Sequence, residues 1–414
     1  MAEDRKHVMI TEGSVTMRYE TRSSDTKTRG KNLDDGPVFY NKVQVFNRDL
    51  SILMMSLFAQ WRYVERSVYK SRRGLRGDEA EAAAKKEKDR LYALSAGELD
   101  ALLEASAEDD GITILDALAA TGLRSIRYAK EVPGVKGVVA NDVDRDAADA
   151  CAKNVAENGG GVSKKCRALC EDAVSHMIAS RPLPLENDGA DKNKKKNAVY
   201  DVVDLDPYGS CVPFLDAAVQ CVADGGLLCV TSTDMTVLAG GYPETCYGRY
   251  GSLPTKAKYL HENALRIVLN SVETNANKYG RHIVPILSIS VDFYVRIFVR
   301  VYRKPAEVKR SCGKRAFALQ SAGCPSFYLQ PIARSVGKKT ADSFTPAYLH
   351  RTNEHAAAAS SRRQRRKEGS LAAADDAPKV DDDDDDKAVV NDDDKAAVAA
   401  NEEAAVVDDE EKAA

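Results

Sequence analysis

The feature that most constrains the fold is a short apolar run ending in an acidic corner. Residues 199–205 (VYDVVDL) are mostly apolar and β-branched, and Asp206-Pro207-Tyr208-Gly209 follows directly. The run lacks clean apolar–polar alternation, which is typical of a strand buried on both faces of a parallel sheet. Ligands of open α/β sheets bind outside the carboxyl ends of such strands. The corner at Asp206 is therefore predicted to lie at the rim of a site.

The rest of the central chain alternates between strand and helix patterns. Helices are expected after the early strands, at 125–130, 145–157, up to about 180, and 212–222. Strands are expected at 112–118, 137–140, 166–170, 199–205, 227–231, 283–291 and 293–302. Only Asp292 separates the last two strands, so they are predicted to pair antiparallel at one end of the sheet. The pattern predicts an α/β fold with a mostly parallel sheet.

The segments outside this alternating region are predicted to form other kinds of structure. A strand is expected at 8–10 and a helix from about 44 to 69. Residues 70–110 are charged and alanine-rich, which predicts a mobile insertion or surface helix without chemistry. The polar segment 182–197 is predicted to be a surface loop, and the Gly/Tyr-rich segment 238–253 a loop that could line a groove. The pattern weakens after Arg303.

Composition narrows the class of protein. The net charge of −3 hides an uneven distribution, because acidic blocks gather near the C-terminus and leave a basic body. No apolar run approaches the roughly 20 residues of a membrane span, and no secretory signal is expected. Nine scattered cysteines indicate an intracellular, reduced protein. Low complexity from about 356 predicts disorder, and the basic cluster 362–367 is either a nuclear import signal or a charged linker.

Acidic residues follow three successive strands. Asp116 precedes a turn of small residues that contains one glycine, Gly122. The N-terminus of the following helix would favour an anionic group of a ligand at this turn. A tight strand–helix turn without a ligand explains the small residues equally well. Asp142 ends the second strand and could accept both ribose hydroxyls of an adenosine, while Asp144 nearby is equally suited to capping a helix. The turn lacks G-x-G-x-x-G, which argues against a nicotinamide enzyme.

The third strand ends in Glu171-Asp172-Ala173. Asp172 could accept a hydrogen bond from an adenine amine while Ala173 offers its backbone N–H, or Asp172 could cap the next helix. Because the three strand ends converge on one edge of the sheet, the acids together fit the adenosine half of S-adenosylmethionine.

The corner at Asp206 suits methylation of an aryl amine. A carboxylate that accepts the amine's hydrogen bond localises the nitrogen lone pair and can take the proton. The Pro207 carbonyl could accept the other N–H, and Tyr208 could stack on the base. The alternative is an Asp-Pro turn that merely closes a buried strand. Asp204 is left unassigned, because it could point to the opposite face.

Two further questions are the role of Arg48 and whether the cysteines and histidines bind a metal. Arg48 lies beside Asp49, and from composition alone a local ion pair on a solvated face is as good an explanation as a ligand contact. The chain has no C-x-x-C and no histidine spacing typical of ligands, so no metal is expected.

At this point the sequence resembles the tRNA (guanine-26, N2)-dimethyltransferase family. The resemblance covers about residues 9–302, in family order. It rests on the segments ITEG, VFYN, FNRDLS, LDALAATGLRSIRYA, VVANDVD, EDA, DVVDLDPYGS and LCVTSTDM, and on the Gly/Tyr-rich segment. The resemblance implies a class I (Rossmann-like) S-adenosylmethionine methyltransferase with a seven-stranded, mostly parallel sheet and a C-terminal domain for tRNA.

The resemblance also assigns roles to residues. It implies that Arg48 and Arg124 contact S-adenosylmethionine, in a site completed by Asp142, Asp172 and Ala173. Asp116 is grouped with this cofactor site. Asp206, Pro207 and Tyr208 fall on the family's catalytic D-P-[FY]-G motif, and Phe39 would sandwich the guanine against Tyr208.

The C-terminal part departs from the family pattern. Ser321-Ala322-Gly323-Cys324-Pro325 has one cysteine where a pair is expected. The expected divisions are an N-terminal extension contributing to the site (1–70), a charged insertion (71–110), the methyltransferase domain (111–303), a remnant of the tRNA-binding domain (304–355) and a disordered tail (356–414).

The predicted reaction transfers one or two methyl groups from S-adenosylmethionine to the N2 amine of guanine 26 in tRNA. The alternatives are an N-methyltransferase for another RNA base and a non-catalytic RNA-binding relative. We expect a monomer that binds tRNA without a metal or membrane. It is expected inside the cell, in the nucleus or else in the mitochondrion or cytoplasm.

Overall fold

The computed structural model describes residues 6–21, 40–181, 200–338 and 341–346. The chain divides into two compact units, Met1–Tyr348 and Leu349–Ala414, and all described residues belong to the first. Phe39, the predicted loop at 182–197, and the tail with its basic cluster lie outside the described residues.

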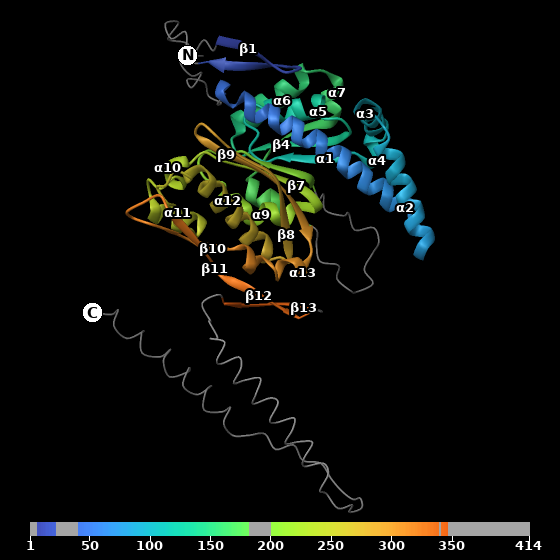
Figure 1. Ribbon diagram of the computed structural model, residues 1–414. Helices are drawn as coiled ribbons and strands as arrows, with labels where there is room; N and C mark the ends of the chain where they lie inside the picture. The colour runs from blue at the N-terminus through green and yellow to red at the C-terminus, as the bar shows by residue number, and fades with distance from the viewer. Residues whose placement is uncertain (1–5, 22–39, 182–199, 339–340, 347–414) are drawn as a thin grey trace, which may run out of the picture. The chain divides into compact units, whose positions relative to one another are not determined.

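The first unit contains a seven-stranded sheet in the order β5-β4-β3-β6-β7-β9-β8. Helices lie on both sides of this sheet (Figure 1). Its strands are β3 (Ile112–Asp116), β4 (Val135–Asp142), β5 (Cys166–Cys170), β6 (Tyr200–Leu205), β7 (Val222–Ser232), β8 (Arg281–Val291) and β9 (Tyr294–Arg303). Strand β9 runs antiparallel to both β7 and β8, whereas β5, β4, β3, β6 and β7 are parallel neighbours. The predicted α/β class and the antiparallel pair at the sheet's end are confirmed.

Strand β6 lies in the middle of this sheet and is buried at all of its positions. Val202 and Val203 are neighbours in sequence, yet they belong to two different hydrophobic cores, one on each face of the sheet. Burial on both faces explains the near-continuous apolar run, because neither face meets water.

Helices cover both faces. One core contains residues of α1 (Val45–Ser71), α5 (Leu123–Glu131) and α6 (Arg145–Glu157). The other contains residues of α8 (Ala173–Ala179), α9 (Val212–Cys221) and α12 (Leu260–Asn277). The short helix α7 (Gly160–Lys165) precedes β5. Two layers of helix around one sheet leave the carboxyl ends of the parallel strands open at a single edge.

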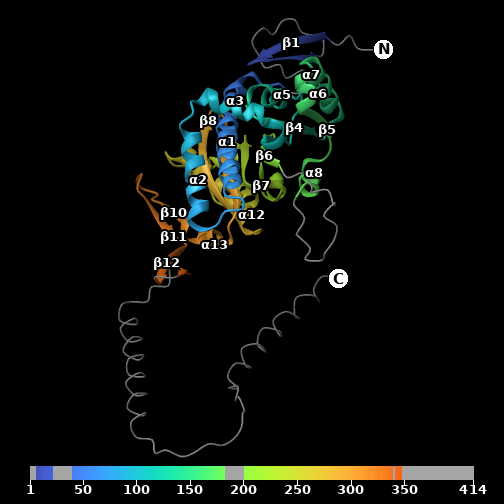
Figure 2. The same ribbon diagram turned by 90° about the vertical axis from the view of Figure 1, so that its right-hand side faces the viewer.

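The charged segment that was predicted to be an insertion or surface helix forms three helices. These are α2 (Gly77–Tyr92), α3 (Ala96–Ala105) and α4 (Ala107–Asp110). Helix α2 runs alongside α1 in both views (Figures 1 and 2). Ala84, Leu91 and Leu103 are buried, so a thin apolar stripe suffices to dock otherwise charged helices.

An N-terminal hairpin packs on the same side as α5 and α6. Strands β1 (Lys6–Glu12) and β2 (Val15–Thr21) pair antiparallel through a turn at Gly13. Val15, Met17 and Tyr19 are buried in the core that contains α1 and α5. The 3-10 turn η1 (Lys42–Gln44) then leads into α1.

The segment 238–253, predicted to be a loop, is largely helical. Helix α10 (Met235–Leu238) is followed by α11 (Pro243–Tyr250), with Pro243 in the first turn and Gly251 in a left-handed conformation at the end. Proline is favoured in the first turn of a helix, and glycine is favoured in the left-handed conformation that ends one. The loop prediction was wrong because Pro243 and Gly251 are the start and stop signals of a helix. Helix α12 begins at Leu260, five residues later than expected.

Beyond β9 the weak sequence pattern still folds into short elements. They are α13 (Pro305–Val308), η2 (Ser311–Lys314) and two antiparallel hairpins formed by β10 (Ala316–Gln320) with β11 (Phe327–Pro331) and β12 (Ala333–Lys338) with β13 (Ala341–Pro346).

Candidate active site

The corner after β6 places Asp206 at the rim of the sheet. Its side chain is 19% exposed, and Oδ2 accepts a hydrogen bond of 2.5 Å from Nη2 of Arg124. Within the described residues, Oδ1 of Asp206 has no hydrogen bond. Thr233 exchanges two bonds of 2.8 Å with Gly209, whose φ of +75° suits glycine, and these bonds fix the corner. Oδ2 of Asp206 is therefore held by Arg124, whereas Oδ1 retains its capacity to accept a hydrogen bond.

Asp204 lies directly beneath this rim. It is fully buried, pairs with Arg296 Nη1 at 2.7 Å, accepts a 2.5 Å hydrogen bond from Tyr128 and lies 3.7 Å from Arg124. Burial would raise the pKa of Asp204, but Arg296 and Arg124 outweigh it and lower that pKa. The idea that Asp204 could face away from Asp206 is wrong, because both carboxylates lie at the same guanidinium. Arg124 contacts both.

The guanidinium of Arg124 thus links the buried acid to the rim acid. Arg124 comes from the first turn of α5 and is itself buried. Its Nη1 also donates to Ser51 Oγ at 3.4 Å, and Ser51 accepts a 2.8 Å bond from Arg296. A planar, charged group with several fixed partners orients Asp206 with little freedom.

Asp116 does not reach the rim. It has no exposed surface and accepts a 2.6 Å hydrogen bond from Ser125, while its Oδ1 has no partner among the described residues. Burial and the nearby charge of Asp204 raise the pKa of Asp116 to about 7. Because Asp116 is fully buried, it lies beneath the site and does not contact a ligand directly.

Asp142 ends β4 and organises the turn after β3. Its Oδ2 accepts a 2.8 Å bond from the N–H of Ala120, and Oδ1 accepts a 3.0 Å bond from the N–H of Asp144. Ala120 has a φ of +47°, unusual for a residue with a side chain, so this bond stabilises a strained turn. Each carboxylate oxygen retains acceptor capacity for a ligand. Asp144 caps α6 through the N–H of Asp146.

Asp172 caps α8, as one of the two interpretations had it. Its Oδ1 accepts a 2.8 Å bond from the N–H of Ser175, which lowers its pKa. The side chain is exposed, so Oδ2 remains accessible. The N–H of Ala173 belongs to the first turn of α8, where backbone donors lack intrahelical partners. Capping and ligand binding are compatible here.

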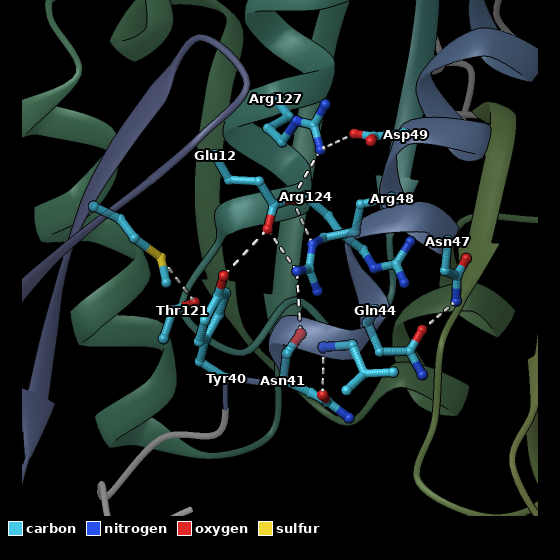
Figure 3. A network of polar contacts seen from close by, with 12 residues as sticks. Glu12, Tyr40, Asn41, Gln44, Asn47, Arg48, Asp49, Thr121, Arg124 and Arg127 are labelled. Atoms are coloured by element: carbon cyan, nitrogen blue, oxygen red, sulfur yellow. Dashed lines mark hydrogen bonds and ion pairs between the residues drawn. The ribbon is translucent and has the colours of Figure 1, made fainter. Parts of the chain in front are cut away.

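Arg48 is part of a buried network (Figure 3). Its Nε and Nη2 donate to the two carboxylate oxygens of Glu12 at 2.6 and 2.5 Å, and Nη2 also donates to the Asn41 carbonyl. The interpretation of Arg48 as a solvated partner of Asp49 is therefore wrong. Asp49 instead pairs with Arg127 at 2.7 Å.

Glu12 is the residue that sequence reasoning missed. Besides Arg48, it accepts a 2.8 Å bond from Arg127 and a 3.4 Å bond from the hydroxyl of Tyr40. Burial would raise the pKa of Glu12, but the two arginines outweigh it and lower that pKa. The segment ITEG, which contains Glu12, contributes to the family resemblance, but nothing in the local sequence indicates a role for the glutamate.

Two searches of the described residues were negative. They contain no group of three or more His, Cys, Asp or Glu side chains arranged to hold a metal ion. No helix among them combines the length and apolar character needed to cross a lipid bilayer.

The sheet order, the helical layers and the acids at the strand ends define a Rossmann-like fold of the class I methyltransferase type. Its solved relatives include Trm1 from Pyrococcus horikoshii in complex with S-adenosyl-L-methionine, with a TM-score of 0.57, 22% identity, and coverage of 83% of this chain and 73% of that chain. At that identity the likeness establishes the fold.

The chain belongs to the N2,N2-dimethylguanosine tRNA methyltransferase family, whose model matches residues 14–371. It is 44% identical over 310 residues to the tRNA (guanine(26)-N(2))-dimethyltransferase of Drosophila melanogaster, covering 74% of this chain and 49% of the relative. The human enzyme of the same name is 42% identical over 313 residues, covering 72% and 44%. The chain thus spans about half the length of these curated relatives.

Proposed function

We propose that the protein transfers one or two methyl groups from S-adenosylmethionine to the N2 amine of guanine 26 in tRNA. The observation that supports this most directly is Asp206: its carboxylate lies at the carboxyl edge of the sheet, with Oδ2 held by Arg124 at 2.5 Å. Its other oxygen is left to accept a hydrogen bond from an amine. The curated relatives bear the name of this activity.

The donor set fits S-adenosylmethionine. Asp142 would accept hydrogen bonds from the ribose hydroxyls, because both of its oxygens retain lone pairs. Asp172 and the N–H of Ala173 would contact the adenine. Arg48 would bind the carboxylate of the methionine part through Nη1, since Nε and Nη2 are occupied by Glu12.

Bound S-adenosylmethionine supplies an electrophilic methyl group. The chain's own contribution is to hold the guanine amine in line and to receive its proton. Asp206 Oδ1 would accept the N2–H and later the proton, and Arg124 would keep that carboxylate from rotating. The exposed ring of Tyr208, and Phe39, would sandwich the guanine. Positioning of this kind supplies roughly 7–11 kcal/mol of the barrier reduction.

We also propose the wider assignments that follow from the family. Residues 304–355 would be the remnant of a tRNA-binding domain, and residues 1–70 would complete the site, as Glu12 and Arg48 indicate. The protein would act inside the cell, with the nucleus as its compartment and the basic cluster 362–367 as its import sequence.

The test combines substrate and variant. Purified protein is incubated with S-adenosylmethionine and a tRNA transcript that has guanine at position 26, and the product nucleosides are identified by mass spectrometry. We expect N2-methylated guanosine from that position alone. Asp206→Asn should lower the rate by about 10²–10⁴-fold while leaving cofactor affinity unchanged, since residue 206 faces the amine.

Other results would favour the alternatives. Methylation of a different base would indicate an N-methyltransferase with another target. Absence of saturable S-adenosylmethionine binding, with tRNA binding retained, would indicate a non-catalytic RNA-binding relative. Undiminished turnover by Asp206→Asn would remove that residue from the mechanism.

A further inference from the structure

A hollow of about 850 Å³ lies in the part of the chain that follows β7 and has no role in the site described above. It is formed by α10, the turn before α11 and the segment that enters α12. Its lining includes Thr236, Gly241, Tyr242, Lys256, Lys258 and Leu260. The volume is in the range of small-ligand sites.

Hydrogen bonds fix the walls of the hollow relative to the corner. The hydroxyl of Tyr250, at the end of α11, lies 2.8 Å from Ser210 Oγ and donates a 2.8 Å bond to Asp234, which precedes α10. Tyr250 is buried, and burial raises its pKa. These bonds tie α11 and the residue that precedes α10 to the segment that follows the Asp206 corner.

Two neighbouring glycines, of which Gly241 lines the hollow, permit close packing there. A Cβ at Gly240, where φ is +91°, would lie 2.9 Å from the side chain of Lys256. A Cβ at Gly241 would lie 2.5 Å from the carbonyl oxygen of Thr236. Only glycines allow the backbone, the lysine stem and α10 to approach this closely. The stem of Lys256 therefore packs close to Gly240, while the residue as a whole is exposed.

The lining has the chemistry of a nucleic-acid site. Among the described residues, neither Lys256 nor Lys258 forms an ion pair, so two positive charges in the lining lack a protein counter-charge. The ring of Tyr242 is 59% exposed, so its face is accessible to a base. Lysines that neutralise phosphate, together with an aromatic ring on which a base can stack, are typical of single-stranded RNA binding.

We propose that this hollow binds a nucleotide adjacent to the target guanine, with its phosphate at Lys256 and Lys258 and its base on Tyr242. The proposal rests on the proposed function, because a base delivered to Asp206 must leave the helical stack and bring its neighbours with it. The hollow would thereby fix the strand on either side of the reacting base. A protein partner is the competing occupant.

The test uses the double variant Lys256→Gln/Lys258→Gln and a matched control, Lys85→Gln/Lys86→Gln. Lys85 and Lys86 are exposed on α2, and the control removes the same charge. With the tRNA transcript as the probe, we expect the first variant to weaken binding about tenfold and to reduce the slope of log affinity against log salt by about 1–2. The control should match the wild type in both.

A second variant separates stacking from charge. Tyr242→Leu should raise the KM for tRNA several-fold with the salt slope unchanged, since it removes a ring and no charge. The affinity for S-adenosylmethionine should stay at the wild-type value in all variants, which verifies their folding.

The result that overturns the proposal is tRNA affinity and salt slope equal to wild type in Lys256→Gln/Lys258→Gln, as a protein-binding hollow would give. Failure of the proposed function is a different result: the wild type would make no methylated guanosine, while the binding comparison could still be carried out.

Discussion

The two halves of the sheet's carboxyl edge use the same residue type in different ways. At the ends of β4 and β5, Asp142 and Asp172 are bound by backbone N–H groups. In the half formed by β6, Asp204 and Asp206 are bound by guanidinium groups from α5 and β9. A backbone N–H occupies one lone pair and leaves the carboxylate open to a ligand, whereas an arginine fixes both its orientation and its charge.

The comparison teaches that an aspartate's place at a strand end does not decide its role. Asp204 and Asp206 are two residues apart and share Arg124, yet one is fully buried and the other is 19% exposed. The first lies beneath the corner, and under the proposed function the second accepts the proton of the amine. We expect variants to separate these two roles.

The largest effect on stability is expected from Asp204→Asn. It would leave Arg296 buried without its carboxylate partner, and removing one partner of a buried pair costs about 3–5 kcal/mol. Asp206→Asn should cost less, about 1–2 kcal/mol, because its side chain is partly exposed. Urea-induced unfolding of both variants measures the difference, and equal losses would contradict the assignment of Asp204 as the supporting acid.

The next largest effect is expected from Asp142→Ala in the other half of the edge. Loss of a charged acceptor for the ribose hydroxyls should weaken S-adenosylmethionine binding by about 10–100-fold, as measured by calorimetric titration. Asp144→Ala is the matched control, since it removes only the cap of α6. That control should lower stability by about 1 kcal/mol and leave the affinity unchanged. Reversed effects would assign the ribose to Asp144.

The smallest effect on cofactor binding is expected from Glu12→Gln, which tests whether the N-terminal hairpin supports the cofactor site. Without its bidentate partner, Arg48 should be less well oriented and bind the cofactor less well. The KM for S-adenosylmethionine should therefore rise by about tenfold, with a smaller change in kcat. Glu131→Gln is the control, because Glu131 binds Arg127 and Ser14 but not Arg48. An unchanged KM in Glu12→Gln would show that Arg48 needs no such support.

The same variant has a pH signature. The pKa of Glu12 is lower in the folded protein than its unfolded value of about 4.3. The folded state therefore binds fewer protons than the unfolded state in this pH range. Ionised Glu12 stabilises the fold at pH values above its pKa in the unfolded chain, and this stabilisation is lost as the pH falls through its pKa in the folded protein. Glu12→Gln should lose stability at neutral pH and show a shallower decline in acid, as unfolding curves at several pH values would reveal.

Much of the fold was predictable because its determinants are local. The helix at 145–157 and the strand at 166–170 agree with the structure to the residue, since a cap at Asp144 and a short apolar run define them. Positions 238–253 were misjudged because abundant glycine and tyrosine obscured a proline start and a glycine stop.

The site was predictable only in part. Asp142 and Asp206 were placed at the correct edge because parallel strands end together. Glu12 was missed because its partner is 36 residues away and no local pattern joins them. Arginines within the apolar strand β9 could have pointed to a buried acid, since a buried guanidinium requires one.

Sequence patterns alone predicted the order of the sheet strands along the chain, the burial of β6 and the set of acids at the strand ends. Those properties depend on periodicity and on residues close together in the chain. Only the tertiary structure decided which acid is supported and which is exposed, and that Glu12 holds Arg48. Such roles depend on partners from distant elements, whose approach desolvates one carboxylate and leaves its neighbour at the rim.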